Sequence, residues 1–294
     1  MNSLNEYPLW TATITSFNED SSIDFESFEV LLKRQEKAGN GILILGSTGE
    51  NLSLSLEEKK NIVEFTLNQN LNVPVMCGVG GSNFNESKNW IEYLNTNDLS
   101  AYLLVTPLYT KPGAVGQTEW FRILLNKAEK PCMLYNVPSR TGKELSHVMV
   151  RELKNHPNFW AIKEASGSIG EFANYRSDSP STNIFSGDDA MLPYYTLNGA
   201  SGLVSVIANV WPEETKKYVE LCKENKINKH IKLWKEAADA LFIVSNPIPA
   251  KILLHEKGVI KSPALRLPLT VRELEDNSYL MQIDKKITEW NKVN

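Results

Sequence analysis

Cysteine and histidine, the residues that form disulfides and hold most transition-metal ions, are scarce in this sequence. Among its 294 residues there are three cysteines and four histidines. Cys77, Cys132 and Cys222 are odd in number and lack the spacing of metal ligands, so we interpret them as reduced packing residues of a cytoplasmic protein. Because the histidines fall in predicted helices or at helix ends, we expect neither a metal site nor a histidine-based catalytic triad.

Long apolar runs and an excess of one charge sign are also missing. No apolar run is long enough to span a bilayer. Residues 1–8 lack the positive and apolar regions of a secretory signal. The net charge is −4 and no basic cluster stands out, so we expect no nucleic acid and no membrane as a partner.

Eight short apolar runs recur at regular intervals and predict strands. They cover residues 10–17, 42–45, 73–77, 102–105, 132–135, 159–162, 183–185 and 203–207. The runs are continuous rather than alternating, as in strands that are buried on both faces. Polar stretches with helical spacing lie between most of them. This repeated order of strand, loop and amphipathic helix predicts an α/β fold, the (β/α)8 TIM barrel.

Two of the intervening helices can be outlined by their apolar positions. The first has a face made of Phe25, Phe28, Leu31, Leu32 and Gln35. The second is outlined by Leu56, Ile62, Val63, Phe65 and Thr66. Ser55 is expected to cap the second helix, with Glu57 and Glu58 in its first turn.

The pattern changes after Val210, where strand signals end. Helices are predicted at residues 213–224, 229–244, 249–257 and 271–290, with breaks at Asn246-Pro247-Ile248-Pro249 and Ser262-Pro263. We therefore predict a barrel catalytic domain at residues 1–225 and a C-terminal helical domain at residues 226–294. No flexible linker separates them.

Lys163 follows the predicted strand at residues 159–162 directly. At the end of a buried strand, low dielectric disfavours the ammonium form and lowers the pKa of the lysine. A neutral amine in a sheltered pocket is a nucleophile that can condense with a ketone. Many lysines instead end strands in solvent, so this segment alone leaves both interpretations open.

Polar residues gather where the other predicted strands end, which is where barrel enzymes place their chemistry. Gly46–Glu50 can be a tight turn or a binding loop. The glycines of Gly78–Gly81 lack the terminal Gly-Lys-Ser/Thr of phosphate loops, which argues against phosphate binding. For Asp188 and Asp189, helix capping is favoured over metal ligation because no partner stands at a recognisable spacing.

Several of these residues suit a reactive lysine. Tyr135 ends the strand before that of Lys163, and the hydroxyls of Ser47 and Thr48 lie on the same predicted rim, so all three are candidates for moving protons during carbinolamine formation. Arg140 offers a planar fork for a carboxylate, which suits a keto-acid or amino-acid substrate. Alone, an arginine is more often part of a surface ion pair.

Together these motifs resemble the dihydrodipicolinate synthase / N-acetylneuraminate lyase family of class I, pyruvate-dependent aldolases. The resemblance runs from Thr13 to Leu269. Its strongest parts are Gly46-Ser47-Thr48-Gly49-Glu50, Tyr135-Asn136-Val137-Pro138-Ser139-Arg140-Thr141-Gly142, Ile162-Lys163-Glu164-Ala165-Ser166-Gly167 and Ser186-Gly187-Asp188-Asp189. It implies a homotetrameric (dimer of dimers) barrel enzyme without a cofactor, whose lysine forms a Schiff base with pyruvate.

The resemblance also implies a role for each matching residue. Lys163 corresponds to the Schiff-base lysine, Tyr135 to the proton-transferring tyrosine and Ser47 to the relay hydroxyl. Tyr109 corresponds to the relay tyrosine that reaches into the neighbouring subunit. The substrate-binding positions are Thr48 for the pyruvate carboxylate, Arg140 for the carboxylate of the second substrate, and Gly187 and Val204 for the pocket wall.

Arg140 favours the branch whose second substrate is aspartate semialdehyde, in lysine and diaminopimelate biosynthesis, because that aldehyde carries a carboxylate. Ser47 points the other way, since serine at this place is common in N-acetylneuraminate lyases and 2-keto-3-deoxy sugar acid aldolases. A remote alternative is a non-catalytic pyruvate-binding protein. Leu108 replaces the tyrosine of lysine-inhibited relatives, which predicts weak or absent inhibition by lysine.

Overall fold

The computed structural model describes residues 2–293 and divides the chain into two compact units. The first unit contains the chain up to Pro8 and the segment Pro74–Val204. The second unit contains Leu9–Val73 and the chain from Ser205 onward.

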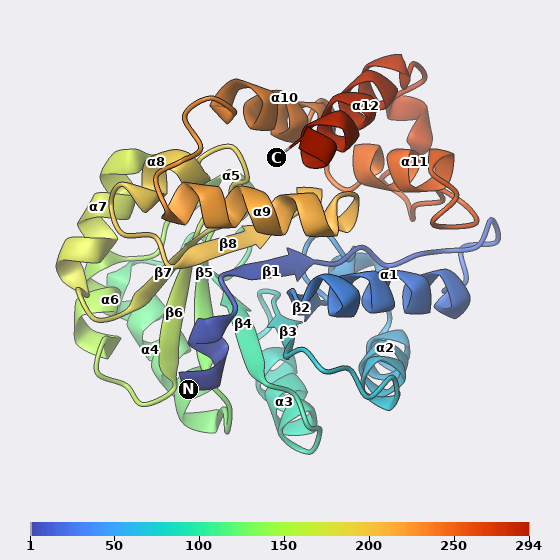
Figure 1. The fold of residues 1–294 in the computed structure, drawn as a ribbon. Coiled ribbons are helices and arrows are strands. Elements are labelled where there is room, and N and C mark those ends of the chain that lie inside the picture. Colours follow the sequence, from blue (N-terminus) through green and yellow to red (C-terminus); the bar gives the residue numbers. More distant parts are fainter. Residues whose placement is uncertain (1, 294) are drawn as a thin grey trace. The chain divides into compact units, whose positions relative to one another are not determined.

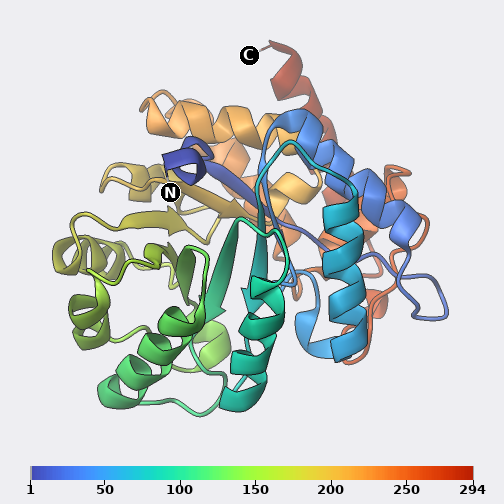
Figure 2. The same ribbon diagram turned by 90° about the horizontal axis from the view of Figure 1, so that it is seen from below.

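The first unit is built on parallel strands. They are β3 (Val75–Val79), β4 (Ala101–Val105), β5 (Cys132–Asn136), β6 (Phe159–Glu164), β7 (Asn183–Ser186) and β8 (Gly202–Ser205), each paired in parallel with the next. Its helices are η1 (Asn2–Glu6), α3 (Phe84–Asn95), α4 (Ala114–Lys127), α5 (Pro138–Thr141), α6 (His147–Leu153), α7 (Ile169–Asp178) and α8 (Leu192–Thr196). Helices α3, α4, α6 and α7 lie outside these strands in Figure 1 and in the turned view of Figure 2 and cover their outer face. Most residues of the strands are buried.

The second unit combines the first two strands with most of the longer helices. Its strands, β1 (Leu9–Ala12) and β2 (Gly41–Ile44), pair in parallel. Its helices are α1 (Phe25–Ala38), η2 (Asn51–Ser53), α2 (Leu56–Asn68), η3 (Ile207–Asn209), α9 (Pro212–Lys223), α10 (Ile231–Leu241), α11 (Ile248–Glu256), η4 (Val271–Glu273) and α12 (Ser278–Val293). As expected, Ser55 caps α2 in a reciprocal capping box with Glu58.

The eight strands form a closed barrel in the order β1 to β8, which confirms the predicted (β/α)8 fold. In such a barrel the loops that follow the strands carry the chemistry. All eight predicted strands are present, with shifted ends. The first ends at Ala12 rather than at Phe17, because Ile14 N–H already donates to the side chain of Asn209 at 3.0 Å instead of to a strand. The sixth continues through Lys163 to Glu164.

Three local predictions are wrong. The helix predicted at residues 271–290 begins at Ser278, because Thr270 and the Asp276 carboxylate hold the preceding segment in turns. Leu56 does not belong to the buried face of α2, since it is 59% exposed. His156 lies in the turn before β6 rather than in a helix, where its ring accepts the N–H of Asn158. The three cysteines are buried, as packing residues are.

Candidate functional site

Lys163 is buried near the carboxyl end of β6. Strand register places it between Tyr135 of β5 and Phe185 of β7. Its side chain is folded over the Tyr135 ring, with Nζ 4.3 Å from the ring centroid, and the residue is 5% exposed. The lysine therefore lies inside the strand layer, not in solvent beyond the strand end.

Burial lowers the pKa of Lys163 from 10.5 to about 7. The loss of solvent is the main cause, and the Arg140 guanidinium lowers the pKa further. The Asp189 carboxylate acts in the opposite direction and raises it. At neutral pH a large fraction of Lys163 is thus an uncharged amine, the form that attacks a carbonyl carbon.

Gly187 gives the lysine side chain its space. A Cβ added at this position would lie 2.8 Å from Lys163 Cε and 2.9 Å from Lys163 Cγ. It would also lie 2.8 Å from the Cβ of Ala165, while the Gly187 N–H donates to the Glu164 carbonyl at 2.7 Å. The backbone is therefore held close to Lys163 at a distance that only glycine permits. The place of Gly187 in a pocket wall stays a prediction.

Asp188 and Asp189 do not cap a helix, contrary to the prediction. Helix α8 begins only at Leu192 and its first turn has no side-chain cap. Asp188 instead accepts the N–H of Ala190 at 2.9 Å within the turn after β7, while Asp189 is buried and acts on the charge of Lys163. The sequence predicted that Asp189 lies at a strand end, but no pattern in it indicated that the carboxylate would affect the pKa of Lys163.

Two further predicted residues of the first unit lie at its surface. Arg140 is in the short helix α5, exposed, and close enough for its charge to affect Lys163. Tyr109 is 91% exposed and has a positive φ of 66°, which is unusual for a residue other than glycine. Val204 is fully buried in β8.

The remaining predicted residues, Ser47 and Thr48, belong to the second unit. They follow β2 in the turn Gly46–Glu50, where Ser47 is exposed and Thr48 is buried. The hydroxyl oxygen of Thr48 accepts a hydrogen bond from the side-chain amide of Asn246 at 3.0 Å. Lys163, Tyr135, Gly187 and Arg140 thus belong to the first unit. The hydroxyl groups of Ser47 and Thr48 belong to the second.

A buried ion pair anchors the end of the same turn. Lys251 of α11 donates to the Glu50 carboxylate at 2.5 Å and to the Ala264 carbonyl at 2.8 Å. The second oxygen of Glu50 accepts the backbone N–H of Arg266 at 3.0 Å. The sequence analysis did not single out Asn246 or Lys251, although Asn246 lies in the predicted break between two helices. The sequence does not indicate which loop such a distant side chain will contact.

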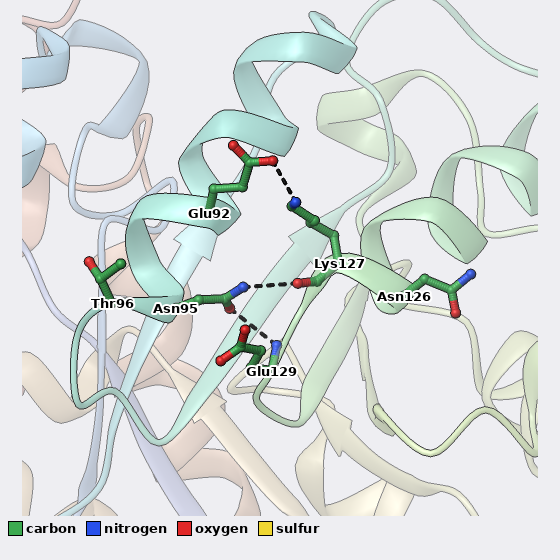
Figure 3. A pocket seen from close by; sticks show the side chains of 6 residues that line it. All are labelled: Glu92, Asn95, Thr96, Asn126, Lys127 and Glu129. Carbon is green, nitrogen blue, oxygen red and sulfur yellow. Dashed lines mark hydrogen bonds and ion pairs between the residues drawn. The ribbon is translucent and has the colours of Figure 1, made fainter.

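The polar depression shown in Figure 3 is not part of this site. It has a volume of about 490 Å³ and is lined by Glu92, Asn95, Thr96, Asn126, Lys127 and Glu129. Its members bind one another: Lys127 pairs with Glu92 at 2.6 Å, and Asn95 bonds the backbone of Lys127 and Glu129. It lies at the C-terminal ends of α3 and α4 and before β5, on the opposite end of the strands from Lys163.

Between Asn2 and Val293, no three His, Cys, Asp or Glu side chains converge in a group that could hold a metal ion. None of the helices described is both long enough and apolar enough to cross a membrane.

Comparison with known proteins relates nearly the whole chain to one family. Residues 7–287 match the model of the dihydrodipicolinate synthetase family. The chain is 50% identical over 283 residues to the 4-hydroxy-tetrahydrodipicolinate synthase of Francisella tularensis subsp. novicida (strain U112), covering 96% of each sequence. It is 44% identical over 286 residues to that of Wolbachia pipientis wMel, covering 97% of each. A similar solved structure is the chloride-inhibited dihydrodipicolinate synthase of Acinetobacter baumannii complexed with pyruvate, with a TM-score of 0.88, 29% identity, and coverage of 96% of this chain and 98% of that one.

Proposed function

This chain belongs to the dihydrodipicolinate synthetase family, and on that premise we propose that it acts as a 4-hydroxy-tetrahydrodipicolinate synthase. It condenses pyruvate with aspartate semialdehyde in lysine and diaminopimelate biosynthesis, in the cytoplasm. The observation that carries the chemistry is Lys163, a buried amine whose pKa is lowered to about 7 and which lies against Tyr135. No cofactor or metal takes part.

The reaction begins with attack of the neutral Lys163 amine on the keto carbon of pyruvate. The carbinolamine formed loses its hydroxyl as water, which requires a proton donor, and leaves a Schiff base. The contact of the Tyr135 ring with the lysine supports Tyr135 as that donor. Loss of a methyl proton then gives an enamine, whose carbon bonds to the aldehyde carbon of the second substrate. Ser47 and Tyr109 pass the protons to and from Tyr135.

The substrates are held by their carboxylates. Thr48 binds the carboxylate of pyruvate, and Arg140 binds that of aspartate semialdehyde through its planar fork. Gly187 and Val204 complete the pocket wall. The exposure of Tyr109 supports its role as a residue that acts in a neighbouring subunit, and the enzyme is proposed to be a homotetramer built as a dimer of dimers.

Borohydride trapping tests the Schiff base. Protein treated with pyruvate and borohydride is expected to gain a pyruvyl group on Lys163, located by mass spectrometry of its peptides. The Lys163→Ala variant is the matched control and should gain none. Absence of an adduct on the wild-type lysine would exclude the class I mechanism, and a turnover rate equal to that of Lys163→Ala would instead support a non-catalytic pyruvate-binding protein.

Ser47 supports a second candidate function, that of an N-acetylneuraminate lyase or 2-keto-3-deoxy sugar acid aldolase. Both functions share the Schiff base, so the decisive measurement compares second substrates. We expect turnover of aspartate semialdehyde with pyruvate and no cleavage of sugar acids. Conversely, cleavage of a sugar acid without turnover of the semialdehyde would assign the chain to the lyases.

Leu108 leads to a prediction on regulation. It stands where lysine-inhibited relatives carry a tyrosine, so an effector pocket would lack an aromatic wall and a hydroxyl. We expect that micromolar lysine leaves the steady-state rate unchanged. A concentration-dependent fall of the rate in that range would contradict the expectation, and a Leu108→Tyr variant measures whether the aromatic side chain alone introduces sensitivity.

A further inference from the structure

Asn246 is a buried polar side chain whose hydrogen bonding is incomplete. It is 5% exposed and lies two residues before α11. Its amide N–H donates to Thr48 Oγ1 at 3.0 Å, while its Oδ1 has no hydrogen-bond partner among the described residues. A buried acceptor without a partner is unfavourable. Within the described part of the chain, the bond that the amide N–H makes to Thr48 is thus the one hydrogen bond of this side chain.

The bond from Asn246 determines what the Thr48 hydroxyl can do. A hydroxyl has one hydrogen to donate and lone pairs that accept. Because Asn246 occupies a lone pair of Oγ1, the hydroxyl hydrogen is left to point elsewhere. Thr48 makes no other side-chain hydrogen bond within the part of the chain that the structure describes. Its hydrogen is therefore available to a bound acceptor such as a carboxylate.

The turn that carries Thr48 does not depend on this bond for its shape. Its backbone is closed by the Gly49 N–H bonded to the Gly46 carbonyl and by the Glu50 N–H bonded to the Ser47 carbonyl, each at 3.1 Å. The turn is fastened to the rest of the unit by Thr15, whose hydroxyl donates to the Gly49 carbonyl at 2.8 Å. Removal of the Asn246 amide is thus expected to change the direction of the Thr48 hydroxyl and to leave the backbone of the turn in place.

We propose that Asn246 is a positioning residue, which directs the Thr48 hydroxyl hydrogen toward the carboxylate of the α-keto acid. The proposal rests on the proposed function, since it takes Thr48 as the ligand of that carboxylate. Asn246 acts through Thr48 on the binding of the keto acid and takes no part in the proton transfers at Lys163. A contact of this kind is made equally in the ground state and the transition state, so its loss raises KM for pyruvate and leaves kcat unchanged.

The experiment measures KM and kcat for four variants: Asn246→Ala, Asn246→Asp, Thr48→Val and Thr48→Val/Asn246→Ala. Asn246→Ala should raise KM for pyruvate about tenfold, the scale of one hydrogen bond to a charged group, with KM for aspartate semialdehyde unchanged. Asn246→Asp should raise it further, because an aspartate takes the hydroxyl hydrogen and repels the carboxylate. In the Thr48→Val background, Asn246→Ala should add less than about a factor of two.

Asn40→Ala is the matched control. Asn40 is also a buried asparagine of the second unit with an unpartnered Oδ1, but it lies before β2, where it donates to Gln35 and to the Pro212 carbonyl. It should lower the melting temperature without changing KM for pyruvate. If Asn246→Ala does not fold, the isosteric Asn246→Asp variant carries the test.

Two results would overturn the proposal: a wild-type KM for pyruvate in Asn246→Asp, or a full tenfold effect of Asn246→Ala in the absence of the Thr48 hydroxyl. Either result leaves the borohydride adduct on wild-type Lys163 intact and so removes only the role of Asn246. A missing adduct would instead remove the proposed function itself.

Discussion

Burial of one lysine amine has a cost in stability that is linked to its reactivity. The folded chain holds Lys163 with a pKa of about 7, against 10.5 for a lysine in water. Below pH 7 the residue is protonated in both the folded and the unfolded states, and the folded state bears the full cost of a buried charge. Between pH 7 and 10.5 only the unfolded state binds the proton, so the cost decreases as the pH rises.

Replacement of Lys163 by methionine is therefore expected to stabilise the protein while it abolishes adduct formation. The gain in unfolding free energy should be greatest below pH 7 and should decrease by about 1.4 kcal/mol per pH unit above it. Urea unfolding at pH 6 and pH 9 measures both values. A variant that is less stable than the wild type at pH 6 would contradict the cost assigned to the buried amine.

Gly187 tests the space around the lysine. In Gly187→Ala the new methyl group would meet Lys163 Cε and Cγ below 3 Å, so the amine must move and trapping with pyruvate should slow. Gly170→Ala in α7 is the control, because the nearest atom to its Cβ would be 3.6 Å away. We expect the control to trap pyruvate at the wild-type rate. Equal rates in both variants would show that Gly187 is not needed for the lysine position.

At the scale of elements, the turn after β2 depends on α11. Lys251 and Glu50 are almost completely buried, and Lys251 also lies 4.2 Å from the centroid of the Phe17 ring. Burial is the main cause that lowers the pKa of Lys251 to about 8, while Glu50 raises it. The ion pair thus links the turn after β2 to α11, two elements that are far apart in the sequence.

Removal of one partner should be strongly destabilising, since it leaves the other charge buried. We expect Lys251→Met to lower the unfolding free energy by about 3–5 kcal/mol, measured by chemical denaturation. The comparison is Lys33→Met, which breaks the more exposed pair with Glu36 and should cost at most about 1 kcal/mol. Similar losses for the two variants would argue against a special role of the buried pair.

The elements were predictable from the sequence because they depend on local patterns. Continuous apolar runs predicted all eight strands, and the capping serine at Ser55 predicted the start of α2. The ends were less certain, as in β6, where Lys163 continues a strand that the loss of apolar character suggested would stop at Ile162. The division at residues 225 and 226 stays a prediction.

Strand ends and side-chain chemistry singled out Lys163, Tyr135 and Arg140 as candidates, and the family resemblance supplied their individual roles. The match to residues 7–287 confirms that resemblance, while the roles of Lys163, Tyr135 and the others remain proposals. Asp189, Asn246 and Lys251 depend on contacts between distant segments or on burial. The spacing of residues along the chain indicates neither these long-range contacts nor the burial of a side chain. A buried ion pair, for example, contains the same residue types as an exposed one.

At the scale of the whole molecule, the proposed role of Tyr109 predicts that each active site contains residues of two subunits. Lys163→Ala and Tyr109→Phe should each be nearly inactive alone. If Tyr109 acts in a neighbouring subunit, the two variants unfolded and refolded together should regain about a quarter of the wild-type activity, because half of the pairs are mixed and each mixed pair has one complete site. No recovery, with mixed assemblies detected by mass spectrometry, would place Tyr109 in its own subunit's site.

The contacts of the N-terminal segment have a consequence for biosynthesis. The carbonyl of Pro8 accepts the N–H of Leu203, and the turn after β2 receives Asn246 and Lys251. The two partners of each contact are about 200 residues apart in the sequence, so the ribosome synthesises the first long before the second. The earliest strands therefore emerge before the segments that bind them exist. During that interval the nascent chain exposes unpaired strand edges. Its yield in a cell should therefore depend on chaperones that shield the first half of the chain until the last third has been translated.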